Sequence, residues 1–303
     1  MYIQADLFPM TKIAVIGHIA IDKVIDETGR RVQLGGPPSY IALSFGILGD
    51  RIHAVSKIGD DISNKFLRQL RDLGVNAGNM IVDGTETTRF ILDYTQEKRV
   101  LGVESVCEKI GSDDIEDLPD AALITPIIGE LTESAVEAIQ SDVLALDPQG
   151  FLRRTLDDGS IQLQPWRDRE LLGRLDVLKA SADEVALITG ESDPRRGIEK
   201  IRRLGASVAV TTLGQKGSLV AFGGRLSQVP AYDSDVRNST GAGDVFLGSF
   251  MSEYLRGENP VWCACVGSAM ASLVVETFGA RIDSRKRDVF RRAEELLDSV
   301  VRV

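Results

Sequence analysis

The sequence predicts an α/β fold with a central, mostly parallel sheet flanked by helices. Short apolar runs at 122–129 and 142–147 are separated by a helical pattern at 132–140. This alternation indicates parallel strands that are joined by right-handed helical crossovers. The 303 residues are enough for one large α/β domain or for two smaller ones.

The composition is that of an ordinary globular protein, with 43% hydrophobic and 26% charged residues. The 45 acidic against 35 basic residues give a net charge of -10, which argues against a general affinity for nucleic acid or acidic membrane surfaces. The three cysteines are too few and too badly spaced for a disulfide framework, and with two histidines no ordinary zinc site is expected. No stretch reads as a signal peptide or as an apolar run long enough to cross a bilayer. We therefore expect a soluble, cytoplasmic protein.

The chain begins with an extension at residues 1–9 that carries no motif, and the folded domain is expected to run over 10–303. A buried strand is predicted at 13–17, and residues 28–34 alternate as a short hairpin strand does. Residues 85–103 are rich in β-branched and aromatic residues around a polar Q-E-K-R segment, which predicts a pair of strands.

Helix signals lie between and after these strands. Gly35 and Gly36 let a ligand approach the backbone closely, and the two prolines that follow fit the first turn of a helix. Amphipathic or apolar patterns predict further helices at 62–73, 261–275 and 284–300.

The centre of the chain carries a polar motif at the carboxyl end of a predicted strand, where ligands of parallel sheets bind. It reads D-P-Q-G-F-x-R from Asp147, and Gln149 and Arg153 are candidate contacts for hydroxyl groups. The alternative is a polar loop that satisfies its own backbone. After it, Ser181 is expected to cap a helix that ends at a glycine.

The motif R-N-S-T-G-A-G-D-V-F-L-G-S-F at 237–250 carries the strongest chemical signal. Gly241, Ala242 and Gly243 leave backbone N–H groups pointing outward at a helix start, where the helix dipole also favours an anion such as a phosphate. Asp244 among these donors fits a base that takes a proton from a hydroxyl while the amides hold the developing negative charge. The alternative is that Asp244 only complements the dipole and the glycines form a tight turn.

Two motifs carry a family resemblance. S-T-G-A-G-D followed by V-F-L-G-S-F resembles the signature of the ribokinase (PfkB) family of carbohydrate and nucleoside kinases, and L-G-G-P-P-S-Y at 34–40 resembles its N-terminal Gly-Gly signature. They stand in the family's order and at about its spacing, and the resemblance extends over residues 12 to 298. It implies a ribokinase-like fold with a small β-sheet lid built from about 28–35 and 85–103.

The resemblance implies ATP-dependent phosphorylation of a hydroxyl, with Mg²⁺ bridging the nucleotide phosphates. Asp244 is then the catalytic base, and the amides of Gly241, Ala242 and Gly243 form the anion hole. The acceptor contacts implied by the resemblance and by the central motif are Asp22, Gly35, Gly36, Gln149 and Arg153. Thr87 and Arg89 are candidates to face the acceptor from the lid, and the alternative is that they are solvent-facing strand positions.

On the donor side, Thr212, Gly214 and Gly217 lie in a segment that resembles the family's T-L-G-x-x-G nucleotide segment, although a plain glycine turn between core strands is the alternative. Ser181 and Glu184 align with the family's N-x-x-E, whose glutamate helps hold the water shell of the magnesium ion. Ser268 replaces an asparagine in the adenine region. These departures leave ATP and Mg²⁺ as the expected cofactors.

The central motif together with I-Q-L-Q-P at 161–165 is similar to archaeal myo-inositol kinases, so a cyclitol acceptor is predicted. Two other interpretations stay open. One is a kinase for a nucleoside (adenosine or cytidine) or a sugar (ribose, fructose or 2-keto-3-deoxygluconate). The other is a catalytically silent ligand-binding module on the same fold. The expected partners are small molecules and, by analogy with lid pairing in the family, a second subunit in a homodimer.

Overall fold

The computed structural model describes residues 12–95, 100–166 and 168–303. The expected extension at 1–9 and the polar segment at 96–99 lie outside the described residues.

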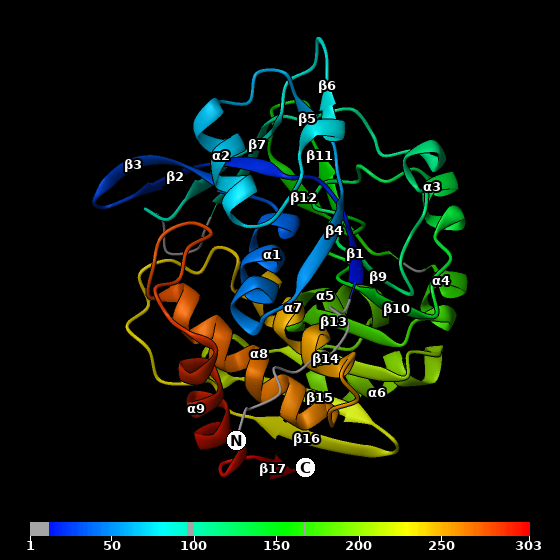
Figure 1. Ribbon diagram of the computed structural model, residues 1–303. Helices are drawn as coiled ribbons and strands as arrows, with labels where there is room; N and C mark the ends of the chain where they lie inside the picture. Colours follow the sequence, from blue (N-terminus) through cyan, green and yellow to red (C-terminus); the bar gives the residue numbers. More distant parts are fainter. Residues whose placement is uncertain (1–11, 96–99, 167) are drawn as a thin grey trace, which may run out of the picture.

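A large sheet runs through the middle of the molecule (Figure 1). Its strands within the described ranges are, in order across the sheet, β17 (Val301–Arg302), β16 (Arg225–Val229), β15 (Ser218–Phe222), β14 (Val208–Thr212), β13 (Val177–Ser181), β10 (Val143–Leu146), β9 (Ala121–Ile124), β1 (Lys12–Ile16) and β4 (Arg51–Val55). The strands from β14 to β4 pair in parallel, and β15, β16 and β17 extend one edge in antiparallel fashion. The predicted central, mostly parallel sheet is confirmed.

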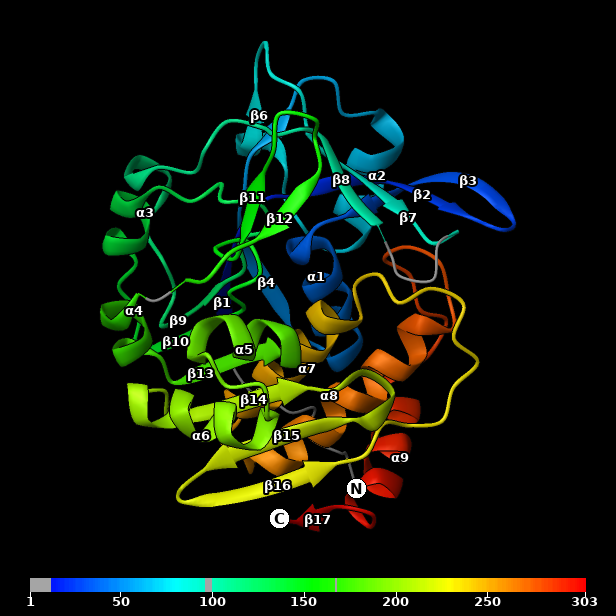
Figure 2. The same cartoon turned by 180° about the vertical axis from the view of Figure 1, so that it is seen from behind.

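Helices cover both faces of this sheet, as Figures 1 and 2 show from opposite sides. One face carries α1 (Pro37–Leu48), α7 (Ala242–Tyr254), α8 (Pro260–Val275) and α9 (Lys286–Leu297). The other carries α3 (Glu133–Ala138), α4 (Arg169–Arg174), α5 (Ala182–Thr189) and α6 (Pro194–Leu204). Each face buries its own apolar cluster against the sheet, which explains why the parallel strands are continuous apolar runs.

Helix starts in the structure follow the capping signals of the sequence. α2 (Asn64–Asp72) begins after Ser63, whose side chain accepts a hydrogen bond from the Phe66 amide. α8 begins at Pro260 after the cap Asn259, whose side chain accepts from the Val261 amide. The helices predicted at 62–73, 132–140 and 284–300 are present with shorter bounds, and the one predicted at 261–275 begins one residue earlier.

A second, smaller sheet has the order β3 (Gly29–Gly35), β2 (Ala20–Asp26), β7 (Thr88–Asp93) and β8 (Val100–Ser105). We call these four strands the small sheet. It is mixed, because β2 and β7 pair in parallel while the outer pairs are antiparallel. The expected lid segments supply β3, β7 and β8, and β2 adds a strand that the sequence analysis did not place there. Since β2 begins four residues after β1 ends, the small sheet lies beyond the carboxyl ends of the parallel strands (Figure 1).

Minor elements complete the fold. They are the strand pairs β5 (Ile58–Gly59) with β6 (Ile81–Val82) and β11 (Arg153–Thr155) with β12 (Ile161–Leu163), and the 3₁₀ turns Gly78–Met80, Ser112–Asp114 and Gly214–Lys216. Within the described ranges, no helix combines the length and the apolar character that a membrane span requires.

Candidate active site

The start of α7 is built to present backbone amides. Gly241 is the N-cap residue with a φ of 79°, a left-handed conformation that favours glycine. Within the described residues, the amides of Gly241, Gly243 and Asp244 donate no hydrogen bond, whereas the Ala242 amide donates to the Ser239 carbonyl at 3.3 Å. The helix start therefore offers free donors to an anion, with Ala242 contributing less than the sequence predicted.

Asp244 lies in the first turn of α7, close to the central motif. The Gln149 side chain donates from Nε2 to Asp244 Oδ1 at 3.4 Å. Burial and the nearby Asp147 carboxylate raise the pKa of Asp244 to about 6, although Lys179 and Arg153 act in the opposite direction. A carboxylate with a pKa in this range can accept a proton near neutral pH.

A compact cavity of about 90 Å³ opens on Asp244. Its polar lining includes Asp22, Gln149 and Arg153, so three predicted acceptor contacts that are far apart in sequence meet at the predicted base. The remaining lining residues are Gly36, Pro37, Tyr40, Phe90, Leu92, Leu101, Ile127, Thr240, Gly241 and Asp244. We call this space the acceptor cavity.

The two glycines before α1 have different tasks. A Cβ atom on Gly35 would lie 2.2 Å from Asp22 Oδ2, so this glycine makes room for the Asp22 carboxylate. Gly36 has a φ of 81° and lines the acceptor cavity. Gly35 is absent from that lining, so its contact with an acceptor stays a prediction.

The structure also places Thr87 and Arg89 away from the cavity. Side chains alternate along β7, and the cavity receives Phe90 and Leu92. Thr87 and Arg89 both bind Asp61 instead, Thr87 Oγ1 at 2.6 Å and Arg89 through an ion pair. Neither residue lines the acceptor cavity, so a contact of either residue with an acceptor stays a prediction.

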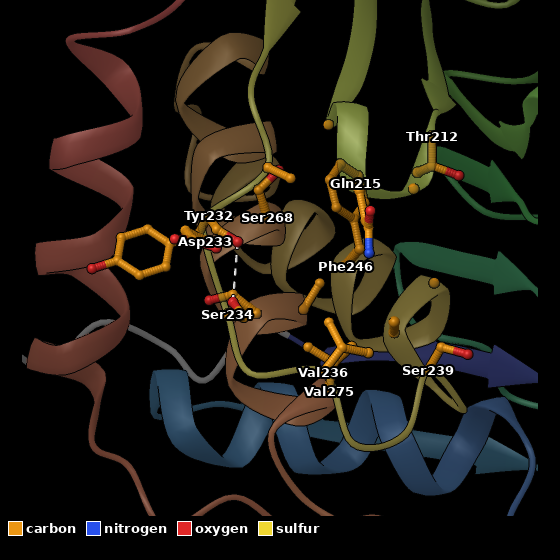
Figure 3. Close-up of a pocket in the computed structure, with 17 residues that line it drawn as sticks. Thr212, Gln215, Tyr232, Asp233, Ser234, Val236, Ser239, Phe246, Ser268 and Val275 are labelled. Atoms are coloured by element: carbon orange, nitrogen blue, oxygen red, sulfur yellow. Dashed lines mark hydrogen bonds between the residues drawn. The ribbon is translucent and has the colours of Figure 1, made fainter.

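A larger cavity of about 650 Å³ lies on the other side of the α7 start (Figure 3). The predicted nucleotide residues Thr212, Gly214, Gly217 and Ser268 all line it. It is further lined by Gln215, Ala231, Tyr232, Asp233, Ser234, Val236, Ser239, Ala242, Gly243, Phe246, Ala271, Ser272 and Val275. We call this space the donor cavity.

Several donor-cavity residues carry no signal in the sequence. In Figure 3 the Tyr232 ring points away from the cavity toward α9, where its hydroxyl donates to Glu295 Oε2 at 3.0 Å. Ser234 Oγ donates to the Tyr232 carbonyl at 3.0 Å. These contacts hold the loop beside the cavity, and the first of them joins residues that are 63 positions apart.

Ser181 and Glu184 form a reciprocal cap at the start of α5. The Ser181 amide donates to Glu184 Oε2 at 2.7 Å, and the Glu184 amide donates to Ser181 Oγ at 3.3 Å. The predicted N-cap is confirmed. Neither residue belongs to the donor-cavity lining, so their contacts to a nucleotide and to a metal stay predictions.

A metal ion would find few protein ligands here. In the part of the chain that the structure describes, no group of three or more His, Cys, Asp or Glu side chains could hold one. A divalent cation would take most of its ligands from nucleotide phosphates and water, as Mg²⁺ commonly does.

The predicted residues on both sides of α7 thus converge on one helix start. A family model described as pfkB family carbohydrate kinase matches residues 10–287. The chain belongs to this family. Both the expected fold and the expected kinase class are thereby confirmed.

Known relatives of this kinase differ in the acceptor that their names give. The chain is 29% identical over 279 residues to the cytidine kinase of Thermococcus kodakarensis, covering 89% of this chain and 98% of the relative. It is 27% identical over 289 residues to the 2-dehydro-3-deoxygluconokinase of Thermoproteus tenax, covering 88% and 86%.

Among solved structures, the kinase resembles a pyrophosphate-dependent kinase in the ribokinase family complexed with a pyrophosphate analog and myo-inositol. The TM-score is 0.78 at 22% identity, over 92% of this chain and 99% of that one. At this identity the likeness establishes the ribokinase-like fold.

Proposed function

We propose that this kinase transfers the γ-phosphoryl group of ATP to a hydroxyl of a small polyol, with myo-inositol as the first candidate. The observation that carries the proposal is the meeting of two cavities at the start of α7. Ala242 and Gly243 line the donor cavity, while Gly241 and Asp244 line the acceptor cavity. A phosphoryl group that passes between the cavities must cross the free amides.

ATP as the donor is supported by the size of the donor cavity and by its position. At about 650 Å³ it lies within the usual range for small-molecule sites, and it extends from the helix start toward α8. When bound, Mg²⁺ would neutralise phosphate charge, with Glu184 as the proposed ligand through water.

The transfer itself needs a base and a hole for the negative charge. Asp244 takes the proton of the acceptor hydroxyl while the hydroxyl oxygen forms a bond to the γ-phosphorus. The bond between the γ-phosphorus and the β-phosphate oxygen breaks, and ADP leaves. The Gly241 and Gly243 amides stabilise the charge on the transferring group, because they are already oriented before the reaction begins. Gln149, which donates to Asp244, holds the carboxylate toward the acceptor.

A polyol acceptor is supported by the lining of the acceptor cavity. Two carboxylates, an amide and a guanidinium surround a space of about 90 Å³, and they can bind hydroxyls on several sides of one ring. Phe90, Leu92 and Leu101 supply an apolar wall from the small sheet, which would act as a lid that keeps water from the reaction.

A nucleoside acceptor is the second candidate, because the cytidine kinase of Thermococcus kodakarensis is the relative reported above at 29% identity. A nucleoside needs room for a base as well as a sugar. The small acceptor cavity therefore favours a single-ring acceptor over cytidine or adenosine.

ADP release from ATP and Mg²⁺ tests the proposal, measured with myo-inositol, ribose, fructose, 2-keto-3-deoxygluconate, adenosine and cytidine. Selective turnover of myo-inositol is expected. Turnover of another acceptor would reject the cyclitol and keep the kinase, and no ADP release with any acceptor would favour a ligand-binding module.

The cytoplasmic location and the homodimer expected from the sequence remain proposals. Light scattering of the purified kinase checks the second of them, with twice the mass of the chain as the expected result.

A further inference from the structure

A buried ion pair lies directly beneath the proposed transfer site. Lys179 is the central residue of β13, and it lies level with Asp147, which directly follows the end of the neighbouring strand β10. Lys179 Nζ lies 2.6 Å from Asp147 Oδ2, and the side chains are 7% and 2% exposed. Parallel pairing of the two strands places both groups at the edge of the sheet where ligands bind.

The ammonium group also touches the start of α7. A Cβ atom on Gly243 would lie 2.7 Å from Lys179 Nζ, so the absent side chain of Gly243 is what admits the lysine. Gly243 lines the donor cavity, and its amide is one of the free donors described above. Lys179 thus approaches the proposed anion hole from the sheet side.

The hydrogen bonds of Lys179 leave part of its capacity unused. An ammonium group has three donors, and in the described part of the chain Lys179 donates to Asp147 alone. Unpaired N–H donors of a buried charged group cost folding free energy. The unused donors of Lys179 therefore indicate that a ligand atom accepts a hydrogen bond here.

The phosphates of a nucleotide in the donor cavity could supply this hydrogen-bond acceptor. Of the residues that line it within the described ranges, none is a lysine or an arginine. These lining residues therefore offer no fixed cation to the triphosphate of ATP, and Lys179 lies just behind one of them, Gly243.

We propose that Lys179 donates to the phosphoryl group that the kinase transfers, from beneath Gly243, while Asp147 holds the ammonium in place. The proposal rests on the proposed function in taking ATP as the donor. It assigns a contact to the reacting group that sequence motifs did not suggest.

The surrounding charges agree with this assignment. Burial alone would lower the pKa of Lys179, but nearby carboxylates raise it above its usual value, namely those of Asp147, Glu184 and Asp244. The ammonium is therefore charged whenever the kinase is active.

Substitution of Lys179 alone would leave Asp147 as a buried, unpaired carboxylate, and the protein could fail to fold for that reason. The informative comparison is between Asp147→Asn and the double variant Asp147→Asn, Lys179→Met. Both lack the Asp147 charge, and they differ only in the lysine. Lys200→Met is a matched control, because Lys200 pairs with Glu191 at the surface, with its side chain 46% exposed.

Two measurements are made on these variants. With the best acceptor of the panel, the double variant should have a kcat lower than that of Asp147→Asn by about 100-fold or more, as for loss of one donor to a developing charge. With Mg²⁺ and a non-transferable ATP analogue, calorimetry should show affinity in the double variant weaker by about 10-fold, whereas ADP affinity changes by less than about 3-fold. Lys200→Met should match the unchanged kinase in both.

Equal kcat values and equal analogue affinities in the two variants, within about 3-fold, would overturn the proposal, since Lys179 would then only balance Asp147. Absence of ADP release from the unchanged kinase with any acceptor would instead count against the proposed function. The calorimetric comparison decides the role of Lys179 in that case too.

Discussion

Asp244 is the residue on which the chemistry depends, and its surroundings set the pH at which it works. Burial and the Asp147 carboxylate raise its pKa to about 6, while Lys179 and Arg153 oppose the rise. Asp244 lies beside Gln149 and lines the acceptor cavity, directly after Gly243, which lines the donor cavity.

The raised pKa predicts how activity depends on pH. Below about pH 6 Asp244 is protonated and cannot accept a proton, so kcat/KM should fall as the pH is lowered through 6 and level off above it. A rate profile from pH 4.5 to 8.5 measures this, with circular dichroism at each pH to show that the fold persists. Asp147→Asn should shift this fall in kcat/KM to lower pH, because it removes a negative charge that raises the pKa of Asp244. If kcat/KM of the unchanged kinase falls only near pH 4, the ordinary pKa of a carboxyl group, burial does not raise the pKa of Asp244.

Gly241 should not tolerate a side chain. Its φ is 79°, and a Cβ atom would lie 2.3 Å from the ring of Tyr40, which is 1% exposed and cannot yield. Gly241→Ala should shift the free amides and lower kcat by about 100-fold or more. Initial rates measure the effect. Gly257→Ala is the control, because Gly257 also has a positive φ (83°) but no atom within 4 Å of the added carbon, at a distance from both cavities.

Single residues show where sequence reasoning succeeds and where it stops. The glycines and Asp244 could be predicted because helix-start chemistry is local. The ion pair between Arg89 and Asp61 could not be predicted, because it joins segments that are 28 positions apart. A signal for Lys179 did exist, namely a lysine within the apolar strand D-V-L-K-A, where a charge is expected only with a partner.

At the scale of elements, a hydrogen bond joins the residue after β7 to the loop before α7. Tyr94 directly follows β7, and its hydroxyl lies 2.7 Å from Thr240 Oγ1. The Thr240 amide in turn donates to Asn238 Oδ1 at 2.8 Å, which fixes the loop before α7. A movement of the small sheet toward an acceptor would therefore change the position of the loop that carries the anion hole.

Tyr94→Phe should weaken this link without disturbing the fold. Loss of a hydrogen bond of about 0.5–1.5 kcal/mol predicts a KM for the acceptor higher by about 2-fold to 10-fold. Initial rates at varied acceptor concentration measure the change. Tyr254→Phe removes a hydroxyl from the end of α7, away from both cavities, and should leave KM unaltered. The same KM in both variants would show that the Tyr94 contact has no part in acceptor binding.

Elements were predicted best where one segment decides its own structure. Apolar periodicity located the helices at 62–73 and 261–275, and Ser181 marked the start of α5. The small sheet was predicted only in part, because β2 joins it through pairing with β3 and β7, and pairing partners are not encoded within a strand.

At the scale of the whole molecule, the topology of the large sheet brings the site together. Asp147, Ser181 and Thr212 stand at the carboxyl ends of the neighbouring strands β10, β13 and β14. The sequence therefore predicts the edge of the sheet at which ligands bind. It does not predict the two cavities, because their walls come from distant loops and from the small sheet.

The most direct test of the account is the rate of ADP release by Asp244→Asn, measured with ATP, Mg²⁺ and the best acceptor of the panel. Loss of the base should lower kcat by about 1,000-fold, while circular dichroism and the affinity for ADP stay the same. Asp142→Asn, which changes an exposed aspartate outside both cavities, should have the rate of the unchanged kinase. An Asp244→Asn rate within about 3-fold of that value would contradict the role of Asp244 as the base.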